Sequence, residues 1–179
     1  MLQMIRSTSG CSGLAAVQRT LASPNLSEVR LGLLGAQATP ATPYSAMPIT
    51  LLRAARRDDL PLVLREKLAR AAAAARIRCQ PDLTWPNYAG LPPSVLGVVI
   101  DYYLLKISER WVLVGLDILE QVSSEERAAC IKAWPNLIGD LHWLARRAAS
   151  HSLAESGDEC HHDVGTRALA LLARHGAVV

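Results

Sequence analysis

The sequence predicts an all-α protein: a compact bundle or short stack of about five to six helices behind a flexible N-terminal arm. Three observations support this prediction. Half of the 179 residues are apolar, and Ala, Leu and Val supply most of them without any Phe. Ala, Leu, Arg and Glu lose little side-chain entropy in a helix. Apolar residues also recur every three or four positions in several segments, which proline, glycine and capping residues separate.

Residues 1–48 have the composition of a flexible basic leader that is rich in Ser and Pro. The first acidic residue is Glu28, and Arg6 and Arg19 precede it among many Ser and Thr. An organellar transit peptide has this composition, and so does the leader of a bacterial type III secreted effector. The two alternatives imply different destinations, an organelle matrix or a host cell. In both cases we expect no buried side chain from residues 1–48.

A short helix is expected over residues 26–37, inside this leader. Asn25 is in position to cap it, and Pro40, Pro43 and Pro48 follow in a linker of Pro, Ala and Thr. The helical domain is therefore expected to comprise residues 49–179.

Residues 50–79 show helical periodicity with one interruption. Asp58 and Asp59 precede Pro61, and aspartate as a cap with proline in the first turn is typical of a helix that ends and restarts. The arginines of this segment fall opposite the apolar stripe, so we expect them to be solvated. The stripe that we expect to be buried consists of Leu60, Leu64, Leu68, Ala71, Ala72 and Ala75.

Residues 95–106 fit two kinds of element. Their Val and Tyr content suits a strand, whereas the length of the apolar run suits a buried helix. A β-hairpin near residues 98–116, which would give an α+β fold, is therefore the alternative to an all-α fold. The residues that recur at helical spacing just afterwards, and so favour the helix, are Ile107, Trp111, Val114, Ile118 and Val122.

Three further helices are expected toward the C-terminus. Ser123 and Glu126 have the spacing of a capping box that opens the first of them. The other two are expected over residues 137–148 and 166–175, from their apolar stripes. A polar loop over residues 150–163 is expected to separate them.

A Trp-Pro-Asn sequence occurs twice, at residues 85–87 and 134–136. Proline disfavours helix in the residue before it, and asparagine can cap the helix that follows. Residues 23–25 contain the same Pro-Asn pair without a tryptophan. We therefore interpret the repeat as a helix boundary signal and not as a binding motif.

Charge is unevenly divided along the chain. Residues 1–80 contain 11 Lys and Arg against 4 Asp and Glu, a net charge of +7, whereas residues 81–179 contain 8 against 12, a net charge of −4. A basic half suits a negatively charged partner, either a protein or the phosphate backbone of RNA. The candidate residues for binding a partner protein or RNA are Arg53, Arg56, Arg57, Arg65, Lys67, Arg70, Arg76 and Arg78.

A second candidate site is the polar loop that contains Asp-Glu-Cys-His-His-Asp at residues 158–163. Thiolate, imidazole and carboxylate groups are ligands that transition metals prefer. Consecutive side chains point apart, however, which disfavours their convergence on one ion. The candidate metal ligands are His151, Cys160, His161, His162 and Asp163. No other cofactor is expected.

Two short pieces of the chain resemble parts of an ankyrin repeat. Residues 54–63, AARRDDLPLV, resemble the middle of that repeat, and residues 167–177, RALALLARHGA, resemble its end. The T-P-L-H sequence that begins the repeat is missing before the first piece, and Asp58 replaces the family's glycine. We attribute the likeness to amphipathic helices and assign no family.

The sequence contains no Walker A loop, no dinucleotide-binding glycine motif and no serine nucleophile elbow. The four cysteines include no C-x-x-C pair, which favours an intracellular reducing compartment. Prolines interrupt the long uncharged windows, so no transmembrane span is expected. The sequence therefore favours a non-enzymatic module for protein-protein interaction, such as an adaptor, an assembly subunit or a secreted effector. An RNA-associated accessory protein and a metal-binding protein are the alternatives.

Overall fold

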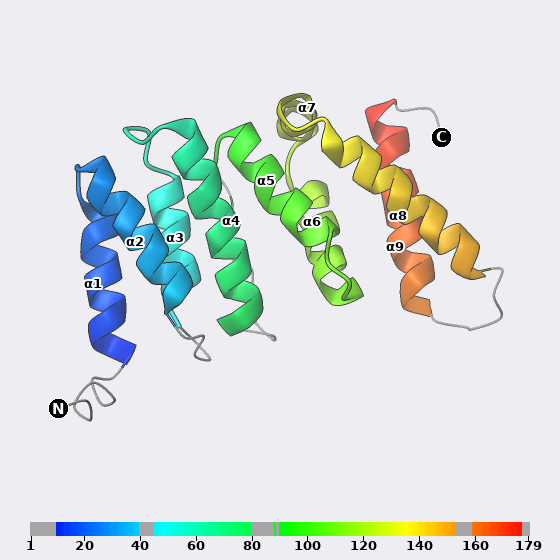
Figure 1. Cartoon of the computed structure of the whole chain (residues 1–179). Helices are drawn as coiled ribbons and strands as arrows, with labels where there is room; N and C mark the ends of the chain where they lie inside the picture. Colours follow the sequence, from blue (N-terminus) through cyan, green and yellow to red (C-terminus); the bar gives the residue numbers. More distant parts are fainter. Residues whose placement is uncertain (1–9, 40–44, 80–87, 89, 153–158, 177–179) are drawn as a thin grey trace. The chain divides into compact units, whose positions relative to one another are not determined.

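The structure, a computed structural model, describes residues 10–39, 45–79, 88, 90–152 and 159–176. All regular elements in these ranges are α-helices (Figure 1), which confirms the predicted all-α class. The alternative with a β-hairpin near residues 98–116 is wrong, because helices occupy that region. The helices in the described ranges are α1 (Gly10–Ala22), α2 (Leu26–Ala38), α3 (Met47–Ala55), α4 (Leu62–Cys79), α5 (Pro93–Leu104), α6 (Glu109–Gln121), α7 (Ser124–Ala133), α8 (Asn136–Ser152) and α9 (Glu159–His175).

The expected count of five to six helices is too low: the described residues form nine. Two of the additional helices, α1 and α2, lie within residues 1–48, which were expected to form a flexible leader. Val17 and Leu21 of α1 and Val29 and Leu33 of α2 are buried, so this expectation is corrected for the described part of the segment. Short helices are marginal alone, and neighbouring helices stabilise these two by covering their apolar sides. A targeting role for the segment stays a prediction.

Local signals in the sequence mark several helix ends as expected. The Asn25 side chain caps α2 by accepting a hydrogen bond from the Ser27 amide at 2.9 Å, and the helix expected over residues 26–37 is confirmed. Ser123 and Glu126 form both halves of the expected capping box at α7. Trp134 is the C-cap of α7 and α8 begins two residues later, which supports the second Trp-Pro-Asn as a boundary signal. The first lies outside the described residues.

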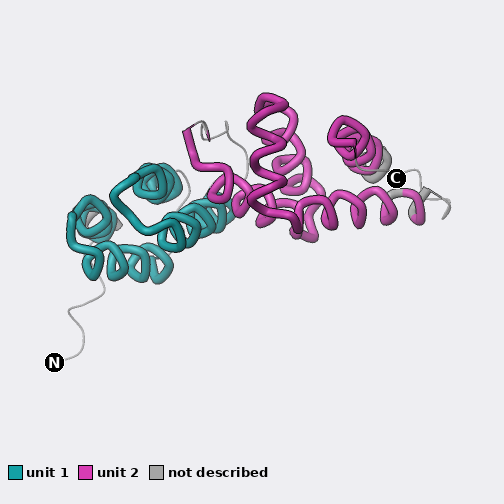
Figure 2. Tube along the Cα trace, turned by 90° about the horizontal axis from the view of Figure 1, so that it is seen from above, with its two compact units in different colours: residues 1–87 teal, residues 88–179 magenta. Residues whose placement is uncertain are grey.

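The chain divides into two units, Met1–Asn87 and Tyr88–Val179 (Figure 2). Unit 1 has 11 basic and 5 acidic residues, a net charge of +6, whereas unit 2 has 8 and 11, a net charge of −3. The charge asymmetry of the sequence therefore follows the division into units. None of the described helices is both long enough and apolar enough to cross a membrane, in agreement with the sequence prediction.

Unit 1 consists of two helical hairpins. Helix α1 packs on α2 and α3 packs on α4, and the hairpins meet where α1 contacts α3 and α2 contacts α4. The predicted break at Asp58 and Asp59 is confirmed, because α3 ends at Ala55 and α4 begins at Leu62. The predicted stripe is buried at all six of its positions, Leu60, Leu64, Leu68, Ala71, Ala72 and Ala75.

Arginine side chains cap the C-terminal ends of two helices in unit 1. The Nη1 atom of Arg57, in the turn between α3 and α4, donates hydrogen bonds to the carbonyl oxygens of Leu21 (2.7 Å) and Ser23 (2.9 Å) at the end of α1. The Nε atom of Arg65 donates to the carbonyl oxygen of Ala55 (3.0 Å) at the end of α3. The last carbonyls of a helix have no partner within it, so both arginines satisfy acceptors that the helices leave open.

In unit 2, α5 contacts α6, α7 and α8, and α9 packs on α6 and α8. Tyr103 of α5 is completely buried, its hydroxyl lies 3.0 Å from the hydroxyl of Tyr88, and its ring stacks on Trp111 of α6 with 6.0 Å between ring centroids. A third arginine cap occurs here: the Nε atom of Arg127 donates to the carbonyl oxygen of Leu119 at the end of α6 (2.6 Å).

An ion cluster joins α9 to α6. Arg167 forms a bidentate pair with Glu120 (3.0 and 2.8 Å) and an ion pair with Asp117. These carboxylates raise the pKa of the Arg167 guanidinium, so the charge that holds the pair is permanent. Helix α9 begins at Glu159, earlier than the expected start at residue 166. Residues that were expected to lie in the polar loop form its first turns.

Two close helix contacts in unit 2 depend on glycine. A methyl group added at Gly97 of α5 would lie 2.7 Å from the Cβ atom of Trp134, and one at Gly115 of α6 would lie 2.8 Å from a methyl carbon of Leu104. Both distances are shorter than van der Waals contact allows, so these helices approach closely only without a side chain.

We predict that Gly97→Ala destabilises the protein by about 1–3 kcal/mol, since the added methyl forces α5 and Trp134 apart. Gly139→Ala is the matched control: Gly139 also lies within a helix of unit 2, but a methyl group there meets open space. Alanine is the better helix former by up to about 1 kcal/mol, so this control is expected to be neutral or stabilising. Chemical denaturation measures both variants. Equal effects would contradict the close contact.

We also predict that Arg57→Leu lowers the free energy of unfolding by about 1–3 kcal/mol, the range for a charged donor removed from carbonyl acceptors. Hydrogen exchange should rise at the end of α1, where Leu21 and Ser23 lose their donor. Arg53→Leu is the control, because Arg53 is exposed on the same hairpin. If Arg57→Leu behaves like this control, the cap does not stabilise the join.

Candidate functional site

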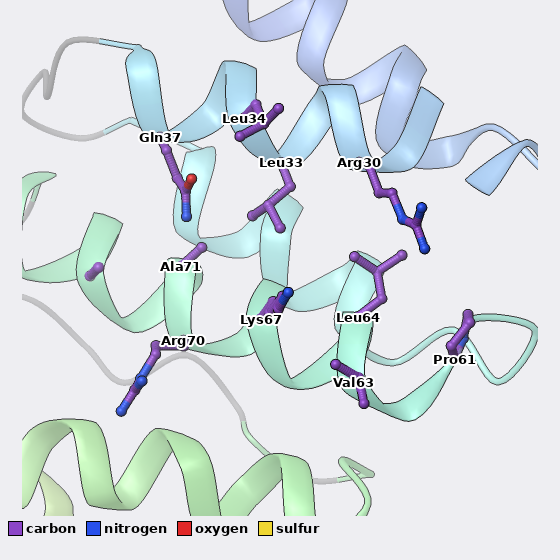
Figure 3. Close-up of a pocket in the computed structure, with 11 residues that line it drawn as sticks. Arg30, Leu33, Leu34, Gln37, Pro61, Val63, Leu64, Lys67, Arg70 and Ala71 are labelled. Atoms are coloured by element: carbon purple, nitrogen blue, oxygen red, sulfur yellow. The ribbon is translucent and has the colours of Figure 1, made fainter. Parts of the chain in front are cut away.

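A groove of about 630 Å³ lies between α2 and α4 of unit 1 (Figure 3). Helix α2 contributes one wall, and α4 with the residue before it contributes the other. The described residues that line the groove are Arg30, Leu33, Leu34, Gln37, Pro61, Val63, Leu64, Lys67, Arg70, Ala71 and Ala74. Its volume is within the range of known binding sites.

The groove has an apolar floor and two apolar side chains that face water. Leu33, Leu64 and Ala71 are buried and form part of the floor. Leu34 on α2 is 61% exposed and Val63 on α4 is 62% exposed, although both line the groove. Isolated exposed apolar residues are common, but a pair on opposite walls of one groove offers a continuous surface for a partner.

The charge of the groove is entirely positive among its described lining residues. Arg30 lies on the α2 side, and Lys67 and Arg70 lie on the α4 side (Figure 3). Arg30 and Lys67 are exposed, and neither forms an ion pair with any other residue in the described ranges. The described lining includes no Asp or Glu. The groove therefore combines apolar surface with two cations, Arg30 and Lys67, that are available to an anionic group.

The sequence explains why the groove remains apolar. Leu33 and Leu34 are consecutive on α2, and Leu62, Val63 and Leu64 are consecutive on α4. Successive helical residues point about 100° apart, so a single core contact cannot cover them all. Leu33 and Leu64 enter the core, whereas Leu34 and Val63 form a second apolar row outside it.

The eight predicted basic candidates do not form one surface. Lys67 and Arg70 line the groove, whereas Arg57 and Arg65 donate to helix-end carbonyls. The expectation that Arg76 is solvated is wrong, since its side chain is only 6% exposed. Neighbouring residues cover more of the circumference of α4 than the apolar stripe indicates. Arg53, Arg56 and Arg78 also lie outside the lining of the groove.

Only Lys67 and Arg70 among the lining residues were predicted as site residues; the others are Arg30, Leu33, Leu34, Gln37, Pro61, Val63, Leu64, Ala71 and Ala74. A leader that contains α2 leaves no reason to expect a surface shared with α4. Both segments contain more consecutive apolar residues than one buried stripe requires. This excess is the signal in the sequence that indicates a second apolar surface.

Most of the predicted metal ligands lie beyond what the structure describes in side-chain detail. Of His151, Cys160, His161 and His162, the backbones belong to α8 and α9, and the side chains are outside the described set. Asp163 is described, and its carboxylate lies 3.9 Å from a guanidinium nitrogen of Arg167, one helical turn later. The metal site stays a prediction.

A pair of carboxyl groups lies between α5 and α8 in unit 2. Asp101 is 5% exposed, and Asp140 is partly buried with one carboxyl oxygen, Oδ2, that has no hydrogen-bond partner in the described ranges. Burial raises the pKa of Asp140 to about 6, and the charge of Asp101 and its hydrogen bond add to the shift. A protonated carboxyl can donate to its neighbour, whereas two carboxylates repel, so the pair favours one shared proton.

Trp143 on α8 is another exposed apolar residue, at 47% of its surface. The Arg147 guanidinium lies 5.2 Å from its ring centroid, so a cation-π contact covers part of the ring. Trp143 does not line the groove between α2 and α4. It is therefore a weaker candidate than a surface to which two helices contribute.

Comparisons with protein-family models, with curated proteins and with solved structures find no match to this chain. The candidate site therefore depends on its own geometry and chemistry.

We predict that Asp140→Asn removes a decrease in stability between about pH 4 and pH 7. The raised pKa means that the folded state holds this proton more tightly than the unfolded state. The stabilisation is complete below about pH 4 and is lost as pH rises through about 6. The Asn side chain cannot lose a proton. The free energy of unfolding of the variant, relative to that of the native chain, should therefore rise by about 1–2 kcal/mol from pH 4 to pH 7, after discounting for partial exposure.

Urea denaturation at a series of pH values measures this difference. Glu125→Gln is the control, because Glu125 is exposed at the start of α7. Parallel pH curves for Asp140→Asn and the native chain would contradict the shared proton.

Proposed function

We propose that this chain is a non-enzymatic module for protein-protein interaction, an adaptor or assembly subunit that binds a partner in the groove between α2 and α4. The observation that carries the proposal is the pair of exposed apolar side chains, Leu34 and Val63, on the two walls of one groove. Water contact with apolar surface costs roughly 25 cal/mol per Å², so a partner that covers both residues gains free energy. A groove between two helices is a common docking site for a peptide segment.

The chemistry of the groove supports binding in preference to catalysis. Its described lining residues include no His, Cys or carboxylate, the side chains that most often transfer protons or attack substrates. Cys130, on α7, is completely buried, and burial raises the pKa of its thiol to about 11. A neutral, buried thiol is a poor nucleophile.

The same lining supports a protein partner in preference to RNA. The described residues of the lining include no aromatic side chain, whereas single-stranded RNA is usually held by stacking on aromatic rings. Arg57 and Arg65, two of the residues on which the RNA alternative depended, donate to carbonyl oxygens of their own chain. They therefore contribute less to a phosphate-binding face than their number in the sequence indicated.

Site-specific crosslinking tests the proposal. We expect a photoreactive residue at position 34 or 63 to crosslink one partner protein in cells that contain the chain. Leu62 is the matched control position: it lies beside Val63 on α4 and is exposed, yet it does not line the groove. The partner, identified by mass spectrometry, should bind the purified native chain and bind the Val63→Ser variant at least about tenfold more weakly, a loss of about 1.4 kcal/mol. Equal crosslinking from positions 62 and 63 would contradict a partner in this groove.

A further inference from the structure

We infer that the occupant of the groove between α2 and α4 is an amphipathic helix whose apolar stripe is bordered by Asp and Glu. The inference rests on the proposed function and specifies the chemistry of the partner. Three features of the groove lead to it: its two helical walls, its apolar floor and the sign of its charges.

The walls favour a helical occupant. The lining residues run from Val63 to Ala74 on α4 and from Arg30 to Gln37 on α2 (Figure 3). Eleven residue steps along α4 correspond to about 16 Å, the length of three helical turns. A helix of that length presents side chains at three- and four-residue spacing along one line, which matches a trough between two helices.

The floor determines what the stripe of the occupant must be. Leu33 and Leu64 are buried at its base, and Leu34 and Val63 stand exposed on its walls. Apolar side chains such as Leu, Met or Phe would pack against this floor and remove Leu34 and Val63 from water. Gln37 is an uncharged polar residue of the lining, and its exposed amide can hydrogen-bond a backbone or side-chain group of the occupant.

The charges determine what borders that stripe. Arg30 and Lys67 stand on opposite walls, and neither has a carboxylate partner in the described ranges. None of the described lining residues is acidic. An occupant with carboxylates on both edges of its stripe therefore meets a cation on each side, whereas a basic helix meets repulsion on each side. The net charge of +6 on unit 1 adds long-range attraction for such a partner.

The test uses the full chain and three synthetic peptides of about four helical turns. All share one leucine stripe at three- and four-residue spacing, and the bordering positions are Glu in the first peptide, Gln in the second and Lys in the third. Fluorescence anisotropy measures binding. We expect the Glu peptide to bind at least about tenfold more tightly than the Lys peptide, with a preference that decreases as salt rises, because exposed charges are screened.

Two charge variants locate the effect. Arg30→Glu combined with Lys67→Glu should reverse the preference toward the Lys peptide. Arg53→Glu combined with Arg78→Glu is the matched control: it changes charge equally at exposed arginines of unit 1 outside the groove, and should keep the preference. Circular dichroism melts verify folding. If the reversed variant unfolds, Arg30→Gln with Lys67→Gln should still remove the preference between the Glu and Lys peptides.

The outcomes separate this inference from the proposed function. Val63→Ser should weaken all peptide binding and Leu62→Ser should not. If the Gln or Lys peptide binds as tightly as the Glu peptide and still requires Val63, the groove binds helices but the acidic partner is wrong. If no peptide binds and crosslinking from positions 34 and 63 also fails, both proposals are wrong. Binding of anionic vesicles or RNA that requires Arg30 and Lys67, without binding of the Glu peptide, would overturn the acidic helix.

Discussion

The carbonyl groups at helix C-termini impose the constraint on which much of this fold depends. A chain of many short helices has many ends, and each end leaves carbonyl oxygens without a partner inside its helix. Arg57, Arg65 and Arg127 donate to such carbonyls at the ends of α1, α3 and α6. Because Arg57 belongs to the second hairpin and its acceptors to the first, one side chain both caps a helix and joins two hairpins. Arginine suits this role, since its planar group carries several donors.

This use of arginine changes how the basic charge of unit 1 is interpreted. A count of arginines in the sequence indicates a binding surface, but some of these side chains satisfy acceptors within the protein. Once the capping arginines are set aside, two cations that line the groove are Arg30 and Lys67. Neither has an acidic partner in the described ranges. A small number of cations on an apolar groove favours a specific segment of protein more than a uniform polyanion, which gains affinity from many phosphate contacts.

Small residues allow close helix packing in both units. Unit 1 is rich in alanine along α4, and Gly32 of α2 lets that helix approach Thr20 and Leu21 of α1. Unit 2 uses Gly97 and Gly115 for close approach and the Arg167 cluster to hold α9 on α6. It also contains the carboxyl pair of Asp101 and Asp140, in which burial and the neighbouring carboxyl raise the pKa of Asp140. An acidic pair of this kind lowers stability at neutral pH, so its presence is a local cost that the surrounding packing offsets.

The sequence by itself determined the helix class and most helix boundaries in the described ranges. Capping residues and prolines affect the backbone within a few residues of their own position. The helix ends at Asn25, Asp58 and the Ser123–Glu126 pair can therefore be predicted from the local sequence. The burial of the α4 stripe was also predictable, because one apolar face must enter some core. The burial of residues from α1 and α2 did not follow from the sequence, since their low charge is equally typical of a leader and of short helices that need neighbours.

Only the tertiary structure decided which helices meet, and the candidate site depends on that. Leu34 and Val63 are 29 positions apart, and nothing local places them on two walls of one groove. The burial of Arg76, the carbonyl acceptors of Arg57 and the raised pKa of Asp140 likewise depend on residues from other helices. Contacts between distant residues depend on how whole helix faces fit together, and a periodic pattern specifies that a face is apolar without specifying what covers it.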